Sequence, residues 1–587
     1  MENINLSEIT SPACIRKMDE KQLRDLAASM RKALLEKLSV HGGHVGPNLG
    51  MIEAIIALHY VFNTPEDKIV FDVSHQTYPH KMLTGRMQAF TDPAHYDDVT
   101  GYTNPKESEY DLFSLGHTSS AVSLASGLAK ARDLKGGKEN VIAVIGDGSL
   151  SGGVAFEGLD YGATLGTNFI VIVNDNDMSI AENHGGIYAD LRLLRDTNGT
   201  ADNNLFRAMG YAYRYVHYGN DIHSLIEMFQ SVKDINYPVV VHLNTMKGMG
   251  LKVAEADKEK FHYSAPFDLK TGEPFSLGES PEGYDDLFAN QVLARMKEMP
   301  ELAVVNAGTP GAIGFDRARR KEAGSQFVDV GIAEQQAVAM ASGLAKGGAH
   351  PVVALASSFL QRAFDQFSQD IALNHQPATF VVFYGSVFGI KDETHLGFFD
   401  LGLLSNIPDL LVLTPTCKEE FLAMLNWSES QHEKPVVIRV PGGAVRSDSK
   451  VTILEDYSRP SYDIVRNGSR IALIGVGTFL PVMEQAAEKL VSNGLDPMVI
   501  NPREVSTLDT ACLDSLSNFD LIITAEDGSV DGGYGQKVAS YFGASDVKVL
   551  NLGLPKEFVN RYDATELLKE CNLTAEQIAE IATSILK

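Results

Sequence analysis

Residues 141–149 (VIAVIGDGS) and residues 169–178 (FIVIVNDNDM) decide the fold of this chain. Each stretch begins as a short run of apolar, mostly β-branched residues and ends in glycine, acidic or amide residues. Runs of this kind between helical stretches are typical of strands buried on both faces of a parallel sheet. The sequence therefore predicts an α/β fold, with polar side chains at the carboxyl ends of neighbouring strands, where such sheets bind ligands.

Apolar runs of the same kind recur along the chain. A second series starts near Leu302 and ends at Val440, and a third occupies the C-terminal part. The polar stretches between the series, residues 268–285 and 442–462, indicate linkers. We expect three α/β domains, each with a mainly parallel sheet flanked by helices. The expected bounds are residues 1–285, 286–450 and 451–587.

The N-terminal part is expected to open with an amphipathic helix. Residues 20–38 carry leucine and methionine at helical spacing. Asp19 and Gln22 stand where a capping box would begin this helix.

The charge balance excludes some classes of partner. The 587 residues include 50 Lys and Arg against 76 Asp and Glu, a net charge of −26 at pH 7. Nucleic acid and anionic membrane surfaces would repel such a chain, so neither is expected as a partner. The four cysteines lack CxxC spacing, and neither a signal peptide nor a transmembrane run is apparent. We expect a soluble, cytoplasmic enzyme that acts on small molecules.

Asp147 and Asn176 follow the two apolar runs that decide the fold. A hard cation such as Mg²⁺ prefers oxygen ligands and usually retains phosphate oxygens and water. One carboxylate and one amide from adjacent strand ends would supply part of that shell, and Gly146 and Gly148 would let the backbone approach a diphosphate. Either motif alone is also typical of an ordinary turn after a strand.

The pairing of GDG with an Asn-rich strand end resembles the cofactor motif of thiamine diphosphate enzymes. The resemblance implies that Asp147, Asn176 and the main-chain carbonyl of Met178 bind Mg²⁺. It also implies that Gly148 and Ser149 lie against the diphosphate of thiamine diphosphate.

Five further motifs narrow the family. In chain order they are DVSHQTYPHKMLTGR (72–86), SLGHTSSAVS (114–123), GIAEQQAV (331–338), SSFLQRAFDQ (357–366) and THLGFFDL (394–401). Together they resemble 1-deoxy-D-xylulose-5-phosphate synthases over nearly the whole chain, more than transketolases or 2-oxoacid dehydrogenase components. The resemblance implies a homodimer whose chain carries the thiamine diphosphate-binding fold twice, followed by a transketolase C-terminal-like domain.

Glu334, in GIAEQQAV, is the first candidate catalytic residue. In thiamine enzymes a glutamate hydrogen-bonds the aminopyrimidine and favours the tautomer whose nitrogen removes the C2 proton of the thiazolium. The resemblance further implies that Phe359 stacks on the aminopyrimidine and that Arg362 lies near the carboxylate of the donor. Taken without their motifs, a solvated glutamate at a helix N-terminus, a core Phe and a surface Arg–Asp pair would explain these residues.

Histidines form the second group of candidates. A histidine titrates near neutral pH and can move protons to and from hydroxyl and carbonyl groups. Neither His41/His44 nor His75/His80 has the HExxH arrangement of a zinc site. The resemblance places one loop and one histidine near the cofactor and three histidines around the reacting carbon. The cofactor-side residues are His75, Gly116, His117 and Thr118, and the reacting-carbon residues are His44, His262 and His395.

The chain departs from the family where the second substrate should bind. The family pattern has arginines that help to bind the acceptor phosphate at the positions of Tyr384 and Gly442. It has a tyrosine at Ala356, an acidic residue at Lys391 and an aromatic residue at Leu251. Lys391 or Arg446 could compensate for the missing arginines, although a lysine lacks the fork geometry of a guanidinium.

The sequence therefore predicts a thiamine diphosphate- and Mg²⁺-dependent carboligase. It would decarboxylate pyruvate and transfer the two-carbon unit to glyceraldehyde 3-phosphate, giving 1-deoxy-D-xylulose 5-phosphate. The alternative is a synthase-like or transketolase-like paralogue that uses a different, unphosphorylated aldehyde. A non-catalytic protein that has kept the fold would have little need for Glu334 beside the metal motif. An acidic protein-interaction module would show no magnesium-dependent binding of the diphosphate cofactor.

Overall fold

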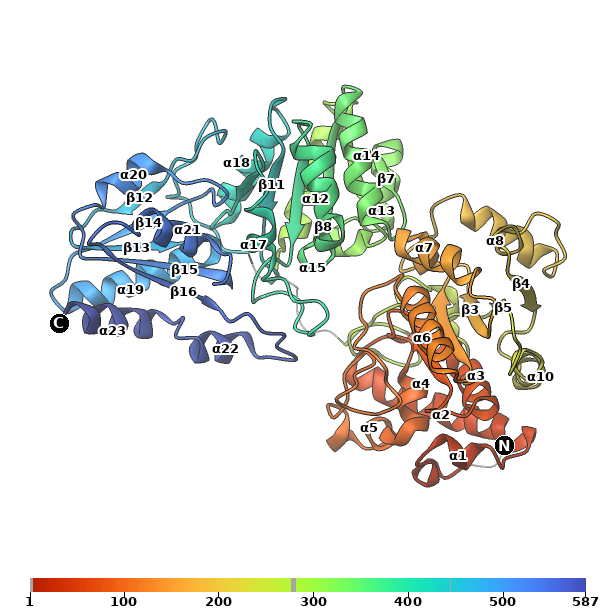
Figure 1. The fold of residues 1–587 in the computed structure, drawn as a ribbon. Helices are drawn as coiled ribbons and strands as arrows, with labels where there is room; N and C mark the ends of the chain where they lie inside the picture. Colours follow the sequence, from red (N-terminus) through yellow and green to blue (C-terminus); the bar gives the residue numbers. More distant parts are fainter. Residues whose placement is uncertain (1–3, 276–280, 444) are drawn as a thin grey trace. The chain divides into compact units, whose positions relative to one another are not determined.

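A computed structural model describes residues 4–275, 281–443 and 445–587 (Figure 1). Residues 276–280 of the first predicted linker and Ala444 of the second lie outside the described residues. The chain divides into two compact units, which are treated separately. The first is Met1–Glu279 with Gly331–Ala333, and the second is Ser280–Val330 with Glu334–Lys587.

The first unit is built on a five-stranded parallel sheet. Its strands lie in the order β1-β2-β3-β5-β4. The bounds are β1 (Lys68–Phe71), β2 (Val141–Gly146), β3 (Phe169–Asp175), β4 (Ala212–Val216) and β5 (Pro238–Asn244). Strands β2 and β3 are neighbours with Gly146 opposite Asn174, so the two predicted strand ends lie side by side.

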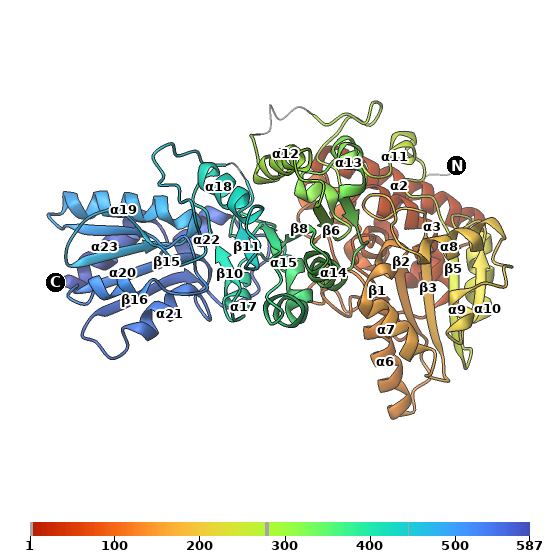
Figure 2. The ribbon, with the colours of Figure 1, turned by 90° about the horizontal axis from the view of Figure 1, so that it is seen from above.

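Both faces of this sheet are covered by helices (Figure 2). Ile142 and Val144 of β2 join one apolar core with α2, α3 and α10, whereas Ala143 and Ile145 join another with α6, α7 and α8. This alternation explains why β2 and β3 consist of apolar residues throughout. The helices are α1 (Pro12–Ile15), α2 (Glu20–His41), α3 (Gly46–Val61), α4 (Tyr78–Lys81), α5 (Gln88–Thr91), α6 (Ala121–Lys135), α7 (Gly153–Gly162), α8 (Ile187–Asp196), α9 (Leu205–Ala208), α10 (Ile222–Val232) and α11 (Lys252–Ala256).

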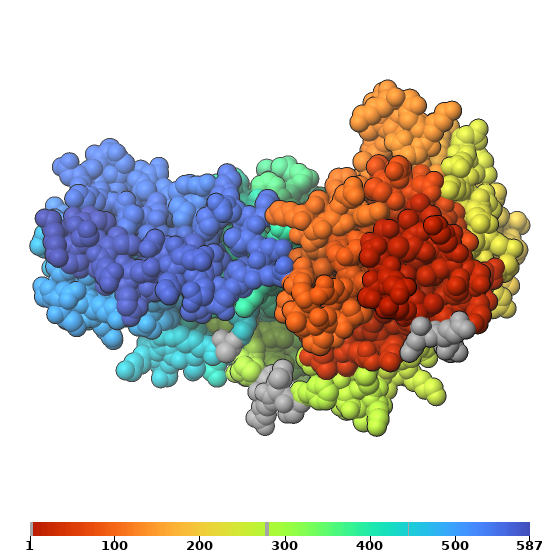
Figure 3. Space-filling model, turned by 90° about the horizontal axis from the view of Figure 1, so that it is seen from below, coloured from red at the N-terminus to blue at the C-terminus, as the bar shows by residue number. Residues whose placement is uncertain are grey.

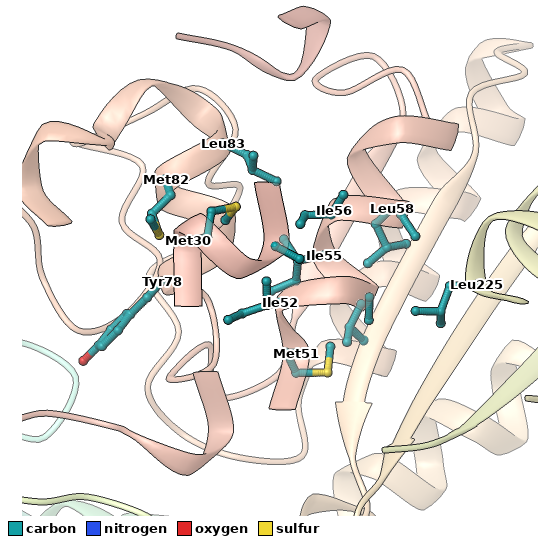
Figure 4. Close-up of a cluster of buried hydrophobic side chains, with 14 of the residues drawn as sticks. Met30, Met51, Ile52, Ile55, Ile56, Leu58, Tyr78, Met82, Leu83 and Leu225 are labelled. Atoms are coloured by element: carbon teal, nitrogen blue, oxygen red, sulfur yellow. The ribbon is translucent and has the colours of Figure 1, made fainter. Parts of the chain in front are cut away.

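Helices α2 and α3 are fixed by capping and by packing, respectively. Helix α2 begins at Glu20 with the predicted capping box, in which Asp19 and Gln22 satisfy each other's backbone N–H groups. Helix α3 is buried almost all round, and Figure 4 shows its side chains Met51, Ile52, Ile55, Ile56 and Leu58 within the apolar core. A helix enclosed in this way is a rigid support for residues at its ends.

The second unit contains two sheets. The first has six parallel strands in the order β10-β11-β9-β8-β6-β7, and the other has the order β12-β14-β13-β15-β16, with only β12 antiparallel. The strands are β6 (Leu302–Asn306), β7 (Phe327–Asp329), β8 (His350–Ala356), β9 (Thr379–Phe383), β10 (Leu411–Leu413), β11 (Val436–Arg439), β12 (Asp463–Arg466), β13 (Ile471–Gly475), β14 (Pro497–Asn501), β15 (Leu521–Ser529) and β16 (Lys548–Leu554).

One apolar core joins the two sheets of the second unit. It contains Val353 and Phe380 from the first sheet and Ile474 and Ile522 from the other. The C-terminal residues form a contiguous surface in the space-filling view (Figure 3, blue). The helices are α12 (Tyr284–Met296), α13 (Arg317–Ala323), α14 (Glu334–Lys346), α15 (Ser357–Leu360), α16 (Phe364–Gln366), α17 (Asp400–Leu404), α18 (Lys418–Ser428), α19 (Leu480–Ser492), α20 (Thr510–Ser515), α21 (Tyr534–Tyr541), α22 (Ala564–Glu570) and α23 (Ala575–Leu586).

The expected α/β fold with three parallel-dominated sheets is confirmed. Within the described ranges, no helix has both the length and the apolar character needed to cross a bilayer.

Candidate active site

A cavity of about 90 Å³ lies in the first unit, at the carboxyl ends of β2 and β3. Eight of the predicted cofactor, metal and catalytic residues line it: His75, Thr118, Asp147, Gly148, Ser149, Asn176, Met178 and His262. Gly116 and His117 belong to the same loop as Thr118 but do not line the cavity. Residues from five separate parts of the sequence therefore meet where the pattern of strands predicted a ligand site.

The predicted metal ligands fit a hard cation. The Asp147 carboxylate is buried and accepts hydrogen bonds from the Met178 N–H at 3.0 Å and from Asn183 Nδ2 at 2.8 Å. Burial and the neighbouring Asp175 carboxylate raise the pKa of Asp147. Asn176 Oδ1 is buried and has no hydrogen-bond partner among the described residues. A buried amide oxygen without a donor and a carboxylate beside another carboxylate both suit an oxygen-preferring cation.

Across the described ranges, no group of three or more His, Cys, Asp or Glu side chains could hold a metal ion. The predicted ligand set at this site combines the Asp147 carboxylate with amide and carbonyl oxygens, and oxygens of a bound molecule would complete it.

A second layer of side chains fixes the strand end before Asn176. Asp175 is fully buried and is held by His242 Nε2 at 2.8 Å and by Arg195 at 2.7 and 2.6 Å. Burial would raise the pKa of Asp175, but His242 and Arg195 lower it overall, so this carboxylate stays ionised. The Tyr213 hydroxyl in turn lies 2.7 Å from His242 Nδ1. The sequence analysis did not predict these contacts. The pattern that could have indicated them is Asp175 at the end of an apolar strand.

Three predicted histidines form a cluster in the first unit. The ring centroids of His44 and His75 are 5.0 Å apart, those of His75 and His262 are 5.1 Å apart, and those of His44 and His262 are 5.8 Å apart. Burial, then the proximity of the other cationic groups, lowers the pKa of His75 and His262 well below the ordinary value. These two rings are therefore neutral near pH 7.

Lys247 is a site residue that sequence reasoning missed. Its Nζ donates to the Ser179 carbonyl oxygen at 2.5 Å and lies 3.1 Å from His262 Nδ1. Burial lowers the pKa of Lys247 to about 7. The sequence pattern that could have indicated it is a lysine directly before a Gly-x-Gly turn, Gly248 and Gly250. In the structure Lys247 lines the cavity.

The loop that carries Gly116–Thr118 is tied to the same strand ends. Asp72, just after β1, accepts hydrogen bonds from the N–H groups of Ser119 and Ala121 at 2.8 and 3.0 Å. The Ser119 hydroxyl donates to the Ser149 carbonyl at 2.8 Å. The three loops at this edge of the sheet are therefore connected by hydrogen bonds.

The second unit holds the other candidates. Glu334 is the first residue of α14 and is 2% exposed, and the Arg362 guanidinium lies 3.5 Å from its carboxylate. Burial raises the pKa of Glu334 in spite of this arginine. Phe359 of α15 meets the His395 ring edge to face, with 5.5 Å between centroids. The second unit thus pairs a buried acid with an arginine and an aromatic ring with a histidine.

His395 is fixed by its own turn. Thr394 Oγ1 lies 2.8 Å from His395 Nδ1, and the His395 N–H donates to the Asp392 carbonyl at 2.9 Å. Although burial alone would raise the pKa of Asp392, hydrogen bonds with His395 and Thr394 lower it. An ionised Asp392 therefore stands beside the His395 ring.

The loop with His395 is also held by the C-terminal part of the chain. The Tyr562 hydroxyl donates to the Val387 carbonyl at 2.9 Å, and the Arg561 N–H donates to the Lys391 carbonyl at 2.7 Å. The Glu393 N–H donates to Asn560 Oδ1 at 3.3 Å. The C-terminal part of the chain thus supplies a segment, residues 560–562, that braces this loop.

Two of the residues that depart from the family pattern, Tyr384 and Gly442, pack against one another. A Cβ at Gly442 would lie 2.4 Å from the Phe388 carbonyl oxygen and 3.0 Å from the Tyr384 ring, so position 442 has no room for a side chain. The Tyr384 hydroxyl donates to the Ala312 carbonyl at 3.3 Å. Leu251 and Ala356 are buried, whereas Lys391 is exposed.

The nearby arginines already have carboxylate partners. Arg439 is buried between Asp400 at 2.8 Å and Asp527 at 2.7 Å. Arg446, which was considered as a substitute phosphate ligand, pairs with Asp448 at 2.8 Å and with Glu484 at 3.6 Å. The Arg439 guanidinium is therefore already paired, whereas Nη1 of Arg446 is buried without a hydrogen-bond partner among the described residues.

Comparisons with known proteins agree with this architecture. A family model described as 1-deoxy-D-xylulose-5-phosphate synthase matches residues 6–202. Models of the transketolase pyrimidine-binding domain and the transketolase C-terminal domain match residues 283–447 and 461–578. The fold and the matches define a thiamine diphosphate-dependent enzyme of the transketolase type.

Individual relatives give the family. The 1-deoxy-D-xylulose-5-phosphate synthase of Symbiobacterium thermophilum is 36% identical over 99% of this chain and 95% of its own length. That of Carboxydothermus hydrogenoformans is 36% identical over 98% of both chains, and synthase 1 of Geobacter sulfurreducens is 35% identical over 99% and 97%. The chain belongs to the 1-deoxy-D-xylulose-5-phosphate synthase family.

Proposed function

We propose that this enzyme binds thiamine diphosphate with Mg²⁺ and joins a two-carbon unit from pyruvate to glyceraldehyde 3-phosphate, forming 1-deoxy-D-xylulose 5-phosphate with release of CO₂. The observation that carries the proposal is the cavity at the ends of β2 and β3, where Asn176 Oδ1 is buried without a donor among the described residues, beside the Asp147 carboxylate. Family membership supplies the reaction.

The residues of the first unit would each have a distinct part. Asp147, Asn176 and the Met178 carbonyl would hold Mg²⁺, and Lys247 would face the diphosphate. When bound, thiamine diphosphate supplies a carbon nucleophile for the keto group of pyruvate. His75 and His262, whose lowered pKa values keep them neutral, would accept protons from hydroxyl groups that lose them.

In the second unit, Glu334 would exchange a proton with the aminopyrimidine. The raised pKa of Glu334 lies closer to neutral pH than that of an ordinary glutamate, which suits repeated protonation and deprotonation. Arg362, 3.5 Å from Glu334, would orient the pyruvate carboxylate, because a planar guanidinium can form two parallel hydrogen bonds. His395 would move protons to and from the aldehyde substrate. The neighbouring Asp392 carboxylate would support this role.

The test is a direct assay of both steps. The parent enzyme should release CO₂ from pyruvate and form 1-deoxy-D-xylulose 5-phosphate when glyceraldehyde 3-phosphate and Mg²⁺ are present. Glu334→Ala should abolish CO₂ release. The matched control is Glu322→Ala, which removes an exposed glutamate paired with Lys297 and should leave the rate unchanged. Undiminished decarboxylation in Glu334→Ala would refute the assigned role.

A second candidate function concerns the acceptor. Arg439 is paired with two carboxylates, and Tyr384 packs against Gly442. These contacts favour an unphosphorylated aldehyde over glyceraldehyde 3-phosphate. Steady-state assays with pyruvate and a panel of aldehydes decide between them. A preference for unphosphorylated acceptors of about tenfold or more in kcat/KM, roughly 1.4 kcal/mol, would establish this alternative.

We also propose that the enzyme is a cytoplasmic homodimer. Phe364 and Leu373 are 41% and 67% exposed near α16, and burial against a second copy would remove this apolar surface from water. All four cysteines are unpaired, which fits a reducing compartment. Light scattering should give twice the chain mass, and Phe364→Asp with Leu373→Asp should give the monomer.

A further inference from the structure

Asn48 joins two segments that carry site histidines. It lies in the first turn of α3 and is fully buried. Its Nδ2 group donates to the carbonyl oxygens of His44 at 2.7 Å and of His75 at 2.8 Å, and its Oδ1 accepts from the Tyr78 N–H at 2.8 Å. One carboxamide therefore uses both donor hydrogens and its acceptor to connect the two segments.

The segment before His75 needs such a restraint. Val73 and Ser74 have φ angles of 57° and 65°, in the left-handed region that residues other than glycine rarely adopt. Backbone conformations of this kind persist only where surrounding contacts impose them. The Ser74 hydroxyl donates to the Leu115 carbonyl at 2.5 Å and accepts from the Thr103 N–H at 2.8 Å. Asn48 holds the chain on the other side of this turn.

Helix α3 makes Asn48 a fixed point. The helix is enclosed by the apolar core over nearly its whole length (Figure 4). Gly46 and Gly50, on either side of Asn48, are packed against backbone, with Cβ positions 3.0 Å from the Phe261 carbonyl oxygen and 2.9 Å from the Met246 carbonyl oxygen. The start of α3 therefore has little freedom to shift, and the carboxamide transmits this rigidity to both histidines.

We propose that Asn48 is a positioning residue that sets the separation of His44 and His75, and through them the geometry of the histidine cluster. This inference rests on the proposed function for its catalytic consequence, but the arrangement of the histidines can be measured independently. A cluster with ring centroids 5.0 to 5.8 Å apart requires both segments in register. Proton transfer depends steeply on such distances, and a misplacement of about 1 Å can reduce a rate roughly 100-fold.

Asn140 provides a matched control. It is also an asparagine of the first unit, 1% exposed, and its Nδ2 donates to Asp67 at 3.0 Å and to Asp234 at 2.8 Å. Its Oδ1 accepts from the Asp234 N–H at 2.8 Å. Asn140 directly precedes β2, at the end of the sheet opposite to the cavity. Loss of its carboxamide should weaken the fold without moving the histidines.

The experiment compares Asn48→Asp with Asn140→Asp in the full-length holoenzyme. At position 48 the new oxygen would face two carbonyl oxygens, and at position 140 it would face two carboxylates, so both changes destabilise. We expect Asn48→Asp to lower kcat at least 30-fold, to change the KM for pyruvate less than threefold and to shift the pH profile of kcat. Asn140→Asp should lower the melting temperature while kcat per folded enzyme stays within twofold of the parent.

NMR spectra of the histidine side chains test this inference independently of the proposed function. In cofactor-free protein labelled with ¹³C in its histidines, His44→Gln and His75→Gln assign the two resonances. Asn48→Asp should move both, whereas Asn140→Asp should leave them in place. This readout holds even if the parent enzyme does not react with pyruvate.

A second variant at position 48 is included in case Asn48→Asp does not fold. Asn48→Ser removes the carboxamide without adding charge and should move the same two resonances. The proposal is overturned if the folded Asn48 variants keep kcat within threefold and the parent spectrum. It is also overturned if Asn140→Asp lowers kcat per folded enzyme as much as Asn48→Asp does.

Discussion

The cavity at the ends of β2 and β3 in the first unit and the region around Tyr384 and Arg439 in the second unit use polar side chains in opposite ways. In the cavity, Asn176 Oδ1 is buried without a donor among the described residues, and Asp147 lies beside another carboxylate. Around Tyr384, charged groups satisfy one another, since Arg439 lies between two aspartates. Buried polar groups without a hydrogen-bond partner in the protein indicate a ligand site, whereas buried charged groups that pair with one another stabilise the fold.

The largest expected effect is at the proposed metal ligands. Asp147→Ala should raise the Mg²⁺ concentration for half-saturation of thiamine diphosphate binding by roughly 100-fold or more, because even the outer partners of metal ligands are worth about 10–100-fold. Calorimetry at fixed cofactor concentration measures this. Asp177→Ala is the control, since Asp177 lies in the same loop but is exposed and paired with Arg195. Equal effects of the two changes would contradict a metal site at Asp147.

The next effect tests whether Arg439 is structural. Arg439→Ala should destabilise the protein by about 3–5 kcal/mol, because Asp400 and Asp527 would be left buried without a counter-charge. Urea unfolding measures the loss. Arg446→Ala removes a partly exposed pair and should cost only about 0–1 kcal/mol. An Arg439 variant with unchanged stability and a raised KM for the aldehyde would instead assign this arginine to the acceptor.

A pH-dependent effect is expected at Lys247. Lys247→Met should weaken thiamine diphosphate binding by about 10–100-fold at pH 6, the value of a charge-assisted hydrogen bond of about 1.5–3 kcal/mol. Because the pKa of Lys247 is about 7 in the cofactor-free site, its charge is present below pH 7 and is lost as the pH rises. A bound anion raises this pKa, so the advantage of the parent enzyme should decline gradually above pH 7.

Affinities of parent and Lys247→Met, measured by calorimetry between pH 6 and 9 at saturating Mg²⁺, check this expectation. A ratio of dissociation constants that stays constant across this range would contradict an electrostatic role for the lysine.

The smallest effect concerns the brace of the His395 loop. Tyr562→Phe removes only the hydroxyl that bonds the Val387 carbonyl, worth about 1 kcal/mol. We expect kcat/KM for the aldehyde to fall about three- to fivefold, with single-turnover CO₂ release from pyruvate unchanged. Tyr541→Phe, which removes a hydroxyl bonded to exposed Asp514, should alter neither quantity. Equal losses in both half-reactions would show that the brace acts on the whole unit.

Much of the fold could be predicted because it depends on local patterns. The apolar runs at Val141 and Phe169 are β2 and β3, and Asp19 with Gln22 caps α2 as expected. Each of these signals lies within a few neighbouring residues. The three predicted domain bounds stay predictions, since the second and third sheets share one apolar core and fall into a single unit.

The site could be predicted only in part. Residues in dense motifs, such as Asp147 and His75, were singled out from the sequence and line the cavity. Asn48 and Lys247 were not, because their importance comes from partners distant in sequence: the His75 carbonyl for Asn48 and the Ser179 carbonyl for Lys247. The structural role of Arg439 was not predicted, since its pairing with Asp527 across two sheets leaves no local pattern.

The contacts between residues 560–562 and the His395 loop affect the order in which parts of the enzyme form during synthesis. Glu393 and Val387 bond residues that lie 167 and 175 positions later in the chain. During synthesis, the histidine cluster and the proposed metal ligands of the first unit emerge long before residues 560–562. A ribosome-bound or truncated chain would therefore acquire the cavity of the first unit early and its supported His395 loop last.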